Sequence, residues 1–274
     1  MVQGILNFEQ YFRAFKGQYV IIGGTACDLL IAERGGDFRA TKDLDMVLIV
    51  EALTSEFGVT FWAFIREAGY KTWCRDGEKP QYYRFENPKN DQYPKIIELF
   101  SRKPEYILPA PDTVSVPIHF DDDTSSLSAI LLDDIYYEFM CSGKVFVADV
   151  GIPVLDVPHL IVFKIRAWLD LTARKTRGEH VDSRNIRKHK NDVFRLAFYA
   201  PTEVITAVPA EIYTDIENFC MEMEKAPVDP ALLVAGGRGR AAHVRSSRVN
   251  AAMKSSRAAS ESPAAKASMP TTPS

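Results

Sequence analysis

A glycine pair and an aspartate pair, joined by one short helical segment, constrain the fold of this chain more than any other sequence feature. Residues 19–22 form an apolar run that ends at Gly23 and Gly24, as a buried strand does. The segment 25–33 has helical composition and ends before another glycine pair. Residues 44–50 are again almost wholly apolar, which predicts a second strand. The chain therefore begins a mixed α+β domain.

The second predicted strand starts with two carboxylates, Asp43 and Asp45, separated by Leu44. Alternate residues of a strand point to the same face, so both carboxylates project together while Leu44 packs behind them. Neighbouring carboxylates repel each other unless a cation lies between them. Such oxygen ligands suit Mg²⁺, and one pair can serve two ions about 3.5–4 Å apart. The alternative is a helix cap or a solvated turn, which the apolar run after Asp45 disfavours.

The glycine pair admits two interpretations. Without side chains at Gly23 and Gly24, a phosphate can approach the backbone N–H groups at the start of the following helix, including that of Thr25. The same turn can also serve only to pack a helix against a sheet. The aspartate pair favours the phosphate-binding interpretation.

The rest of the chain predicts further strands and then helices. The strands are expected at 82–85, 95–100, 128–132 and 144–150, and the helices at 5–16, 57–68, 158–173, 185–199 and 209–223. This order predicts a mixed-sheet domain over residues 1–155, a small helical domain over 156–232, and a disordered basic tail over 233–274.

Charge and composition narrow the function classes. The net charge is −3, although residues 235–274 hold seven Lys or Arg and a single Glu. The remaining body is therefore acidic, which argues against a broad nucleic-acid groove across it. The sequence has no apolar run of membrane-span length and no signal-peptide pattern at its start, so we expect a cytoplasmic protein with reduced thiols. The histidine spacing gives no zinc pattern.

Residues 23–26 (Gly-Gly-Thr-Ala), followed by Arg39-x-Thr41-x-Asp43-Leu44-Asp45, resemble the signature of the DNA polymerase β-like nucleotidyltransferase superfamily. They are most similar to its AbiEii/AbiGii-type toxins, in which a GGTA-like turn precedes an R-x-[ST]-x-DLD strand. The gap between the glycines and the aspartates is longer here than is usual in that family. The resemblance implies that Arg39 and Thr41 help to bind the nucleotide.

The resemblance also implies three site residues beyond this segment. Glu98, in an apolar strand, would be a third carboxylate; its alternative is an outward-facing position. Lys164 would stabilise the triphosphate or the leaving group, and Asp192 matches a functional aspartate in the family's closing helix. The alternatives are that Lys164 extends along a helix surface and that Asp192 only caps or pairs.

The predicted reaction is the magnesium-dependent transfer of a nucleoside monophosphate from an NTP to an acceptor hydroxyl. The residue roles expected on this basis are catalysis by Asp43, Asp45, Glu98, Lys164 and Asp192; nucleotide binding by Gly23, Gly24, Thr25, Arg39, Thr41 and Lys164; and binding of two Mg²⁺ ions by Asp43, Asp45 and Glu98.

The acceptor is open at this point. The resemblance suggests a toxin of a type IV toxin–antitoxin or phage-defence system, with tRNA as acceptor and an antitoxin encoded nearby. A small-molecule, antibiotic-type nucleotidyltransferase would share the same metal core. A non-catalytic member that binds a nucleotide or a partner protein is disfavoured, because a dead site has no reason to keep the costly pair Asp43 and Asp45.

Overall fold

The computed structural model of the protein describes residues 2–73, 81–101, 130, 133–201 and 208–225. The fold is α+β, as predicted, and its centre is a seven-stranded mixed sheet with the order β3-β4-β5-β2-β1-β7-β6. The strands are β1 (Tyr19–Ile22), β2 (Asp43–Leu48), β3 (Lys71–Trp73), β4 (Gln81–Glu86), β5 (Ile96–Phe100), β6 (Lys144–Phe146) and β7 (Pro153–Leu155). The helices are α1 (Ile5–Phe12), α2 (Gly23–Ala32), α3 (Ser55–Ala68), α5 (Asp134–Ser142), α6 (Val157–Thr176), α7 (Ser183–Tyr199) and α8 (Ala210–Lys225), with a 3₁₀ turn at Arg13–Phe15.

Strand β1 lies near the middle of the sheet, between β2 and β7. All four of its residues are buried, which explains why its sequence is apolar without alternation. It pairs antiparallel with β2 and parallel with β7. In turn, β2 pairs parallel with β5. The carboxylate-bearing end of β2 therefore lies beside the start of α2, which follows β1 directly.

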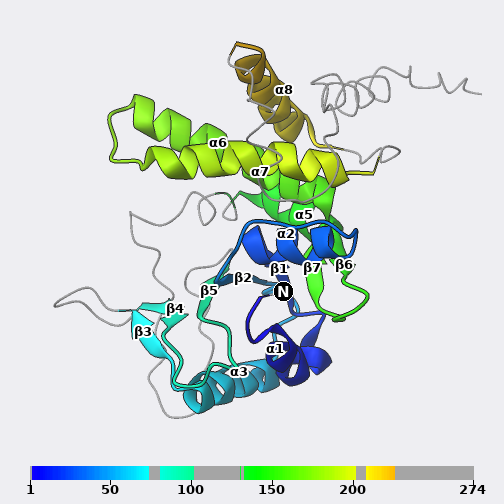
Figure 1. The fold of residues 1–274 in the computed structure, drawn as a ribbon, viewed down its shortest axis with the longest axis vertical. Coiled ribbons are helices and arrows are strands. Elements are labelled where there is room, and N and C mark those ends of the chain that lie inside the picture. Colours follow the sequence, from blue (N-terminus) through cyan, green and yellow to red (C-terminus); the bar gives the residue numbers. More distant parts are fainter. Residues whose placement is uncertain (1, 74–80, 102–129, 131–132, 202–207, 226–274) are drawn as a thin grey trace, which may run out of the picture.

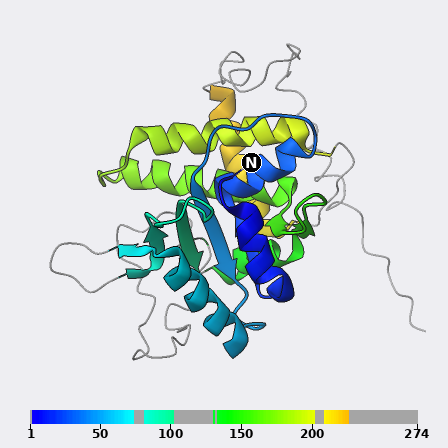
Figure 2. The ribbon, with the colours of Figure 1, turned by 60° about the horizontal axis from the view of Figure 1, so that its bottom comes forward.

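Helices cover both faces of the sheet. Helices α1 and α3 lie on one side and α2 on the other, and the α6–α7 hairpin crosses above α2 (Figures 1 and 2). The aromatic side chains of Phe8, Phe12, Tyr19, Phe57 and Phe64 pack between α1, α3 and β1. Burial of such large rings is the main favourable contribution to folding in this layer.

The helical part starts immediately after β7. Asp156 caps α6 by accepting a hydrogen bond from the backbone N–H of His159, and Pro158 occupies the first turn. Helix α6 packs against α7, and its Trp168 ring meets Phe219 of α8 edge to face at 5.2 Å. Helix α6 also contacts α2. The predicted division at residue 155 coincides with the end of the last strand and stays a prediction as a domain boundary.

Some predicted elements need correction. The helix expected at 5–16 ends at Phe12, where a 3₁₀ turn follows. The strand expected at 144–150 ends at Phe146, because Gly151 at φ +69° closes a turn in which its N–H donates to the Val147 carbonyl. Four of the residues expected in a strand at 128–132 lie outside the described part, and Ile130 is helical. Helix α5 and the short edge strand β3 were not predicted. The predicted tail also lies outside the described residues.

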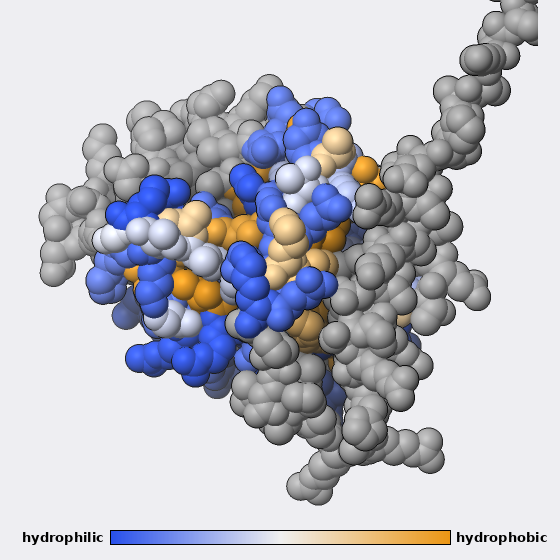
Figure 3. Space-filling model, turned by 90° about the horizontal axis from the view of Figure 1, so that it is seen from above, coloured by the Kyte–Doolittle hydropathy of each residue, from blue (hydrophilic) through white to orange (hydrophobic). Residues whose placement is uncertain are grey.

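Among the coloured residues of Figure 3, hydrophilic ones cover most of the surface seen from above, and smaller hydrophobic areas show between them. Within the described ranges, no helix combines the length and the apolar character that crossing a membrane requires.

Candidate active site

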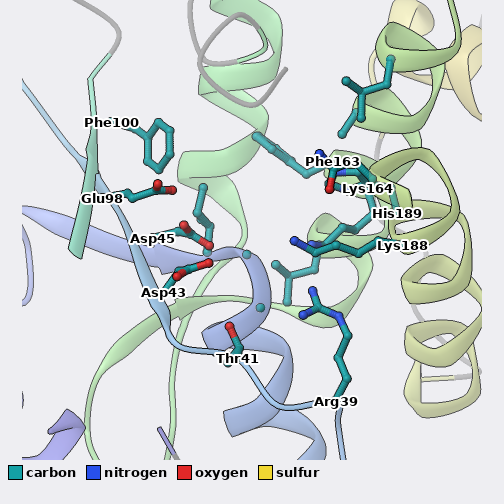
Figure 4. Close-up of a pocket in the computed structure, with 17 residues that line it drawn as sticks. Arg39, Thr41, Asp43, Asp45, Glu98, Phe100, Phe163, Lys164, Lys188 and His189 are labelled. Carbon is teal, nitrogen blue, oxygen red and sulfur yellow. The ribbon is translucent and has the colours of Figure 1, made fainter. Parts of the chain in front are cut away.

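One pocket lies where the start of α2, the ends of β2 and β5, and the α6–α7 hairpin meet (Figure 4). It encloses about 180 Å³. Among the predicted site residues, those that line it are Gly23, Gly24, Arg39, Thr41, Asp43, Asp45, Glu98 and Lys164. Thr25 and Asp192 are fully buried just behind the wall. The structure thus brings residues from five separate segments of the chain to one cavity.

The glycine pair forms the first turn of α2, whereas the sequence prediction placed it in a loop before the helix. Gly23 has φ +67°, and a Cβ added there would lie 1.8 Å from Oδ2 of Asp45. A Cβ at Gly24 would lie 2.7 Å from Oγ1 of Thr41. Thr25 also links the start of α2 to β2, because its hydroxyl donates a hydrogen bond to the Asp43 carbonyl at 2.6 Å. The absence of side chains therefore lets β2 and its carboxylates lie against the N-terminus of a helix.

The three predicted carboxylates share one face of the sheet. Asp45 on β2 lies directly beside Glu98 on β5 in the strand register, and Asp43 precedes Asp45 by two residues. Withdrawal from solvent raises the pKa of Asp45 well above its usual range, and the neighbouring charge of Glu98 raises it further. Glu98 lines the pocket beside both aspartates, so its side chain faces the cavity and does not take the outward-facing alternative.

A fourth charged residue joins this row. Arg84 on β4 is paired with Glu98 in the register, and its Nη1 donates to Oε1 of Glu98. Its Nε contacts Oε2 of Glu86 at 3.5 Å. Burial opposes the charge of Arg84, but Glu98 and Asp43 raise its pKa above the usual value. Arg84 was not among the predicted site residues; its signal in the sequence is a lone charge inside the aromatic run Tyr82-Tyr83-Arg84-Phe85.

The side of the pocket opposite the carboxylates is a cationic wall formed by Arg39, Lys164 and Lys188 (Figure 4). Asp192, with 0% of its side chain exposed, lies 3.4 Å from Nζ of Lys164, which is itself 8% exposed. Asp192 also accepts two hydrogen bonds from Arg39, at 3.2 Å from Nε and 3.0 Å from Nη2. Burial alone would raise the pKa of Asp192, but Lys164 and Arg39 outweigh it and hold that pKa below its usual value. Asp192 pairs with the cations and does not line the cavity.

Helix α7 adds residues that were not predicted as site residues. Asn185, Lys188 and His189 line the pocket on the same helical face as Asp192, and their i, i+3, i+4, i+7 spacing is the signal that could have identified them. Burial, helped by Lys164 and Lys188, lowers the pKa of His189 to about 3, so its imidazole is neutral at pH 7. Its Nδ1 is buried and has no hydrogen-bond partner among the described residues.

The donor set fits a magnesium ion held with the help of a substrate. Mg²⁺ prefers oxygen ligands, keeps several waters, and is commonly bound through one or two carboxylates together with phosphate oxygens. Asp43 and Asp45 meet this requirement. Within the described ranges, no group of three or more His, Cys, Asp or Glu side chains is arranged to hold a metal ion by itself. Waters and the phosphate oxygens of a ligand could complete the coordination.

No protein-family model matches the chain, and neither does any curated protein. Among solved structures, the chain is similar to the crystal structure of an antigenic nucleotidyltransferase-like protein from Paracoccidioides brasiliensis. The two share 15% sequence identity, the match covers 86% of this chain and 92% of that chain, and the TM-score is 0.43.

Proposed function

We propose that this protein is a magnesium-dependent nucleotidyltransferase that transfers a nucleoside monophosphate from an NTP to an acceptor hydroxyl. One observation carries the proposal: two strand carboxylates beside a helix N-terminus face the cations Lys164, Arg39 and Lys188 across a single cavity. Nucleotidyl transfer needs this combination, because a triphosphate must be held, its charge neutralised and its pyrophosphate released.

The cationic wall and α2 would bind the phosphates. Lys164 and Arg39 line the cavity, and each is paired with Asp192. Asp192 therefore acts as a positioning residue that holds both side chains in place before a substrate arrives. The backbone N–H groups at Gly23 and Gly24 stand at the N-terminus of α2, where an anion is favoured. Lys164 would then offset the charge that develops on pyrophosphate.

Asp43 and Asp45 would hold the ion, which when bound supplies positive charge to the phosphate oxygens. Glu98 would accept the proton of the acceptor hydroxyl, because it lines the cavity next to Asp45. Burial raises the pKa of Asp45, and the neighbouring charge of Glu98 raises it further; a bound divalent cation would offset both effects.

Replacing either aspartate tests the reaction. Asp43→Asn and Asp45→Asn should each lower pyrophosphate release from an NTP by at least about 100-fold, as expected when a main electrostatic contribution is removed. Asp149→Asn, in the exposed turn between β6 and β7, is the matched control and should keep wild-type turnover. Wild-type rates in a protein that carries both substitutions would contradict the proposal.

We further propose RNA, and tRNA in particular, as the acceptor. Arg184, Arg187 and Lys188 are exposed on α7, and Lys188 also lines the pocket. A phosphate backbone would therefore meet positive charge at the rim of the site, within an otherwise acidic body. On the family resemblance, the protein would act as the toxin of a toxin–antitoxin or phage-defence pair, with a neighbouring antitoxin as partner.

The acceptor can be identified by labelling. Purified protein is incubated with labelled NTPs, Mg²⁺ and total RNA, and then the Arg184→Ala/Arg187→Ala variant is compared with wild type. RNA labelling should fall at least tenfold in the variant and steeply with added salt, while NTP binding persists. The matched control, Arg13→Ala/Arg66→Ala, removes two exposed arginines from the opposite side of the sheet. No labelled RNA with any NTP would favour a small-molecule acceptor instead.

A further inference from the structure

Arg84, Glu98 and Asp45 form a row of charges across strands β4, β5 and β2. This row bears on the number of metal ions that the site binds. We propose that the guanidinium of Arg84 stands in for the second divalent cation, so that the site works with one Mg²⁺ and Glu98 is not a metal ligand. The inference deepens the proposed function and rests on it. It departs from the expectation of two ions held by Asp43, Asp45 and Glu98.

The strand register sets up the row. Arg84 on β4 lies opposite Glu98 on β5, and Glu98 lies beside Asp45 on β2. Residues directly paired on neighbouring strands point to the same face of a sheet, with Cβ atoms about 4.5–5.5 Å apart. The pairing of the strands therefore places the guanidinium of Arg84 beside the carboxylates. It does not reach them from a loop.

The contact between Arg84 and Glu98 occupies one of the two carboxylate oxygens that Glu98 could offer to a second metal ion. Nη1 of Arg84 donates to Oε1 of Glu98, and the two side chains are only 31% and 19% exposed. A partly desolvated arginine–carboxylate pair is stronger than an exposed one. The second contact of Arg84, at 3.5 Å, is with Glu86, which is the last residue of β4 and does not line the pocket. A metal ion could take Oε1 of Glu98 as a ligand only by displacing Arg84.

Charge balance agrees with this geometry. The pocket carboxylates Asp43, Asp45 and Glu98 carry three negative charges, which one divalent cation and one guanidinium neutralise together. The phosphates that a second ion would screen would face Lys164, Arg39 and Lys188, which line the other wall of the pocket. Consistently, the described residues hold no ready-made group of three metal-binding side chains.

The test counts bound ions directly. Mn²⁺ retained per chain is measured by equilibrium dialysis with a saturating non-hydrolysable NTP analogue, after correction for Mn²⁺ bound to the free analogue. The wild-type protein should retain one ion. Arg84→Met frees Glu98 and should retain two, with the affinity of the second raised at least tenfold, whereas Arg84→Lys keeps the charge and should retain one. Arg66→Met, on the exposed face of α3, is the matched control.

Two ions in the wild-type protein would overturn the inference while leaving the proposed function intact. A single ion in a folded Arg84→Met variant would overturn the role given to Arg84. Absence of both Mn²⁺ and the analogue from wild-type protein would instead remove the proposed function and the inference together. Because the wild-type count decides the first point, the inference stays testable even if Arg84→Met does not fold.

Discussion

Single residues in this protein show how the surroundings of a buried polar group decide whether it stabilises or destabilises the fold. Asp192 is fully buried, yet it is held by Arg39, Lys164 and Arg195. Tyr19 is also buried, but its hydroxyl has no hydrogen-bond partner among the described residues. Burying a charge is tolerable when it is paired, whereas an unpaired hydroxyl retains its full desolvation cost.

Tyr19→Phe should therefore stabilise the protein. The ring keeps its packing against Phe8, Phe12 and Phe57, and only the unpaired hydroxyl is removed. We expect the free energy of unfolding in urea to rise by about 1 kcal/mol. The matched control is Tyr70→Phe, which removes a hydroxyl that donates to the Pro94 carbonyl and should lower the same free energy by about 1 kcal/mol. Equal effects of the two substitutions would contradict this account.

The sequence predicts which residues reach the pocket better than it predicts their partners. Asp43 and Asp45 could be placed on one face because strand periodicity is local. That Asp45 lies beside Glu98, and Glu98 opposite Arg84, depends on the pairing of strands that are far apart in the chain. No local pattern specifies such a register, so the contact between Arg84 and Glu98 could only be recognised in the fold.

Among the elements, the junction of β1 and α2 does most to shape the site. Strand β1 was predicted with its correct ends because a fully buried strand has a distinctive apolar sequence. The start of α2 was misplaced, because a Gly-Gly pair normally disfavours helix. Tertiary packing overrides that preference here: Asp45 and Thr41 occupy the space that side chains at Gly23 and Gly24 would fill.

A comparison of Gly23→Ala with Gly35→Ala separates the effect of backbone strain from the effect of displacing Asp45. Gly23 and Gly35 have nearly the same φ, +67° and +69°, but a Cβ meets nothing within 4 Å at Gly35. Both Gly→Ala variants should lose about 1–2 kcal/mol of unfolding free energy through the left-handed backbone. Only Gly23→Ala should also push the Asp45 carboxylate aside, lowering Mn²⁺ affinity at least tenfold in the presence of an NTP analogue. Unchanged Mn²⁺ binding would show that Asp45 does not need its observed position.

At the scale of the whole molecule, the pocket joins the sheet to the helices. Its carboxylates come from β2 and β5, whereas Lys164 and Lys188 come from α6 and α7. The order of the two parts was predictable from the change of periodicity near residue 156. Their contact at the site was expected only from the family resemblance, which placed Lys164 there; local patterns do not specify it, because it depends on how α6 packs on α2. A ligand in this pocket would touch both parts at once.

Binding of an NTP analogue with Mg²⁺ should therefore stabilise both parts together. At a free ligand concentration of about 100 times Kd the gain is roughly 2.7 kcal/mol, which for a protein of this size raises Tm by about 5–10 °C. A Trp62→Phe/Trp73→Phe variant leaves Trp168 of α6 as the fluorescent reporter of the helices, while far-ultraviolet circular dichroism follows the whole fold. Both signals should shift by the same amount, and neither should shift with Asp43→Asn under the same conditions. A shift of the circular dichroism transition without one of Trp168 would show that the ligand binds the sheet alone, and Lys164 would then have no part in holding the phosphates.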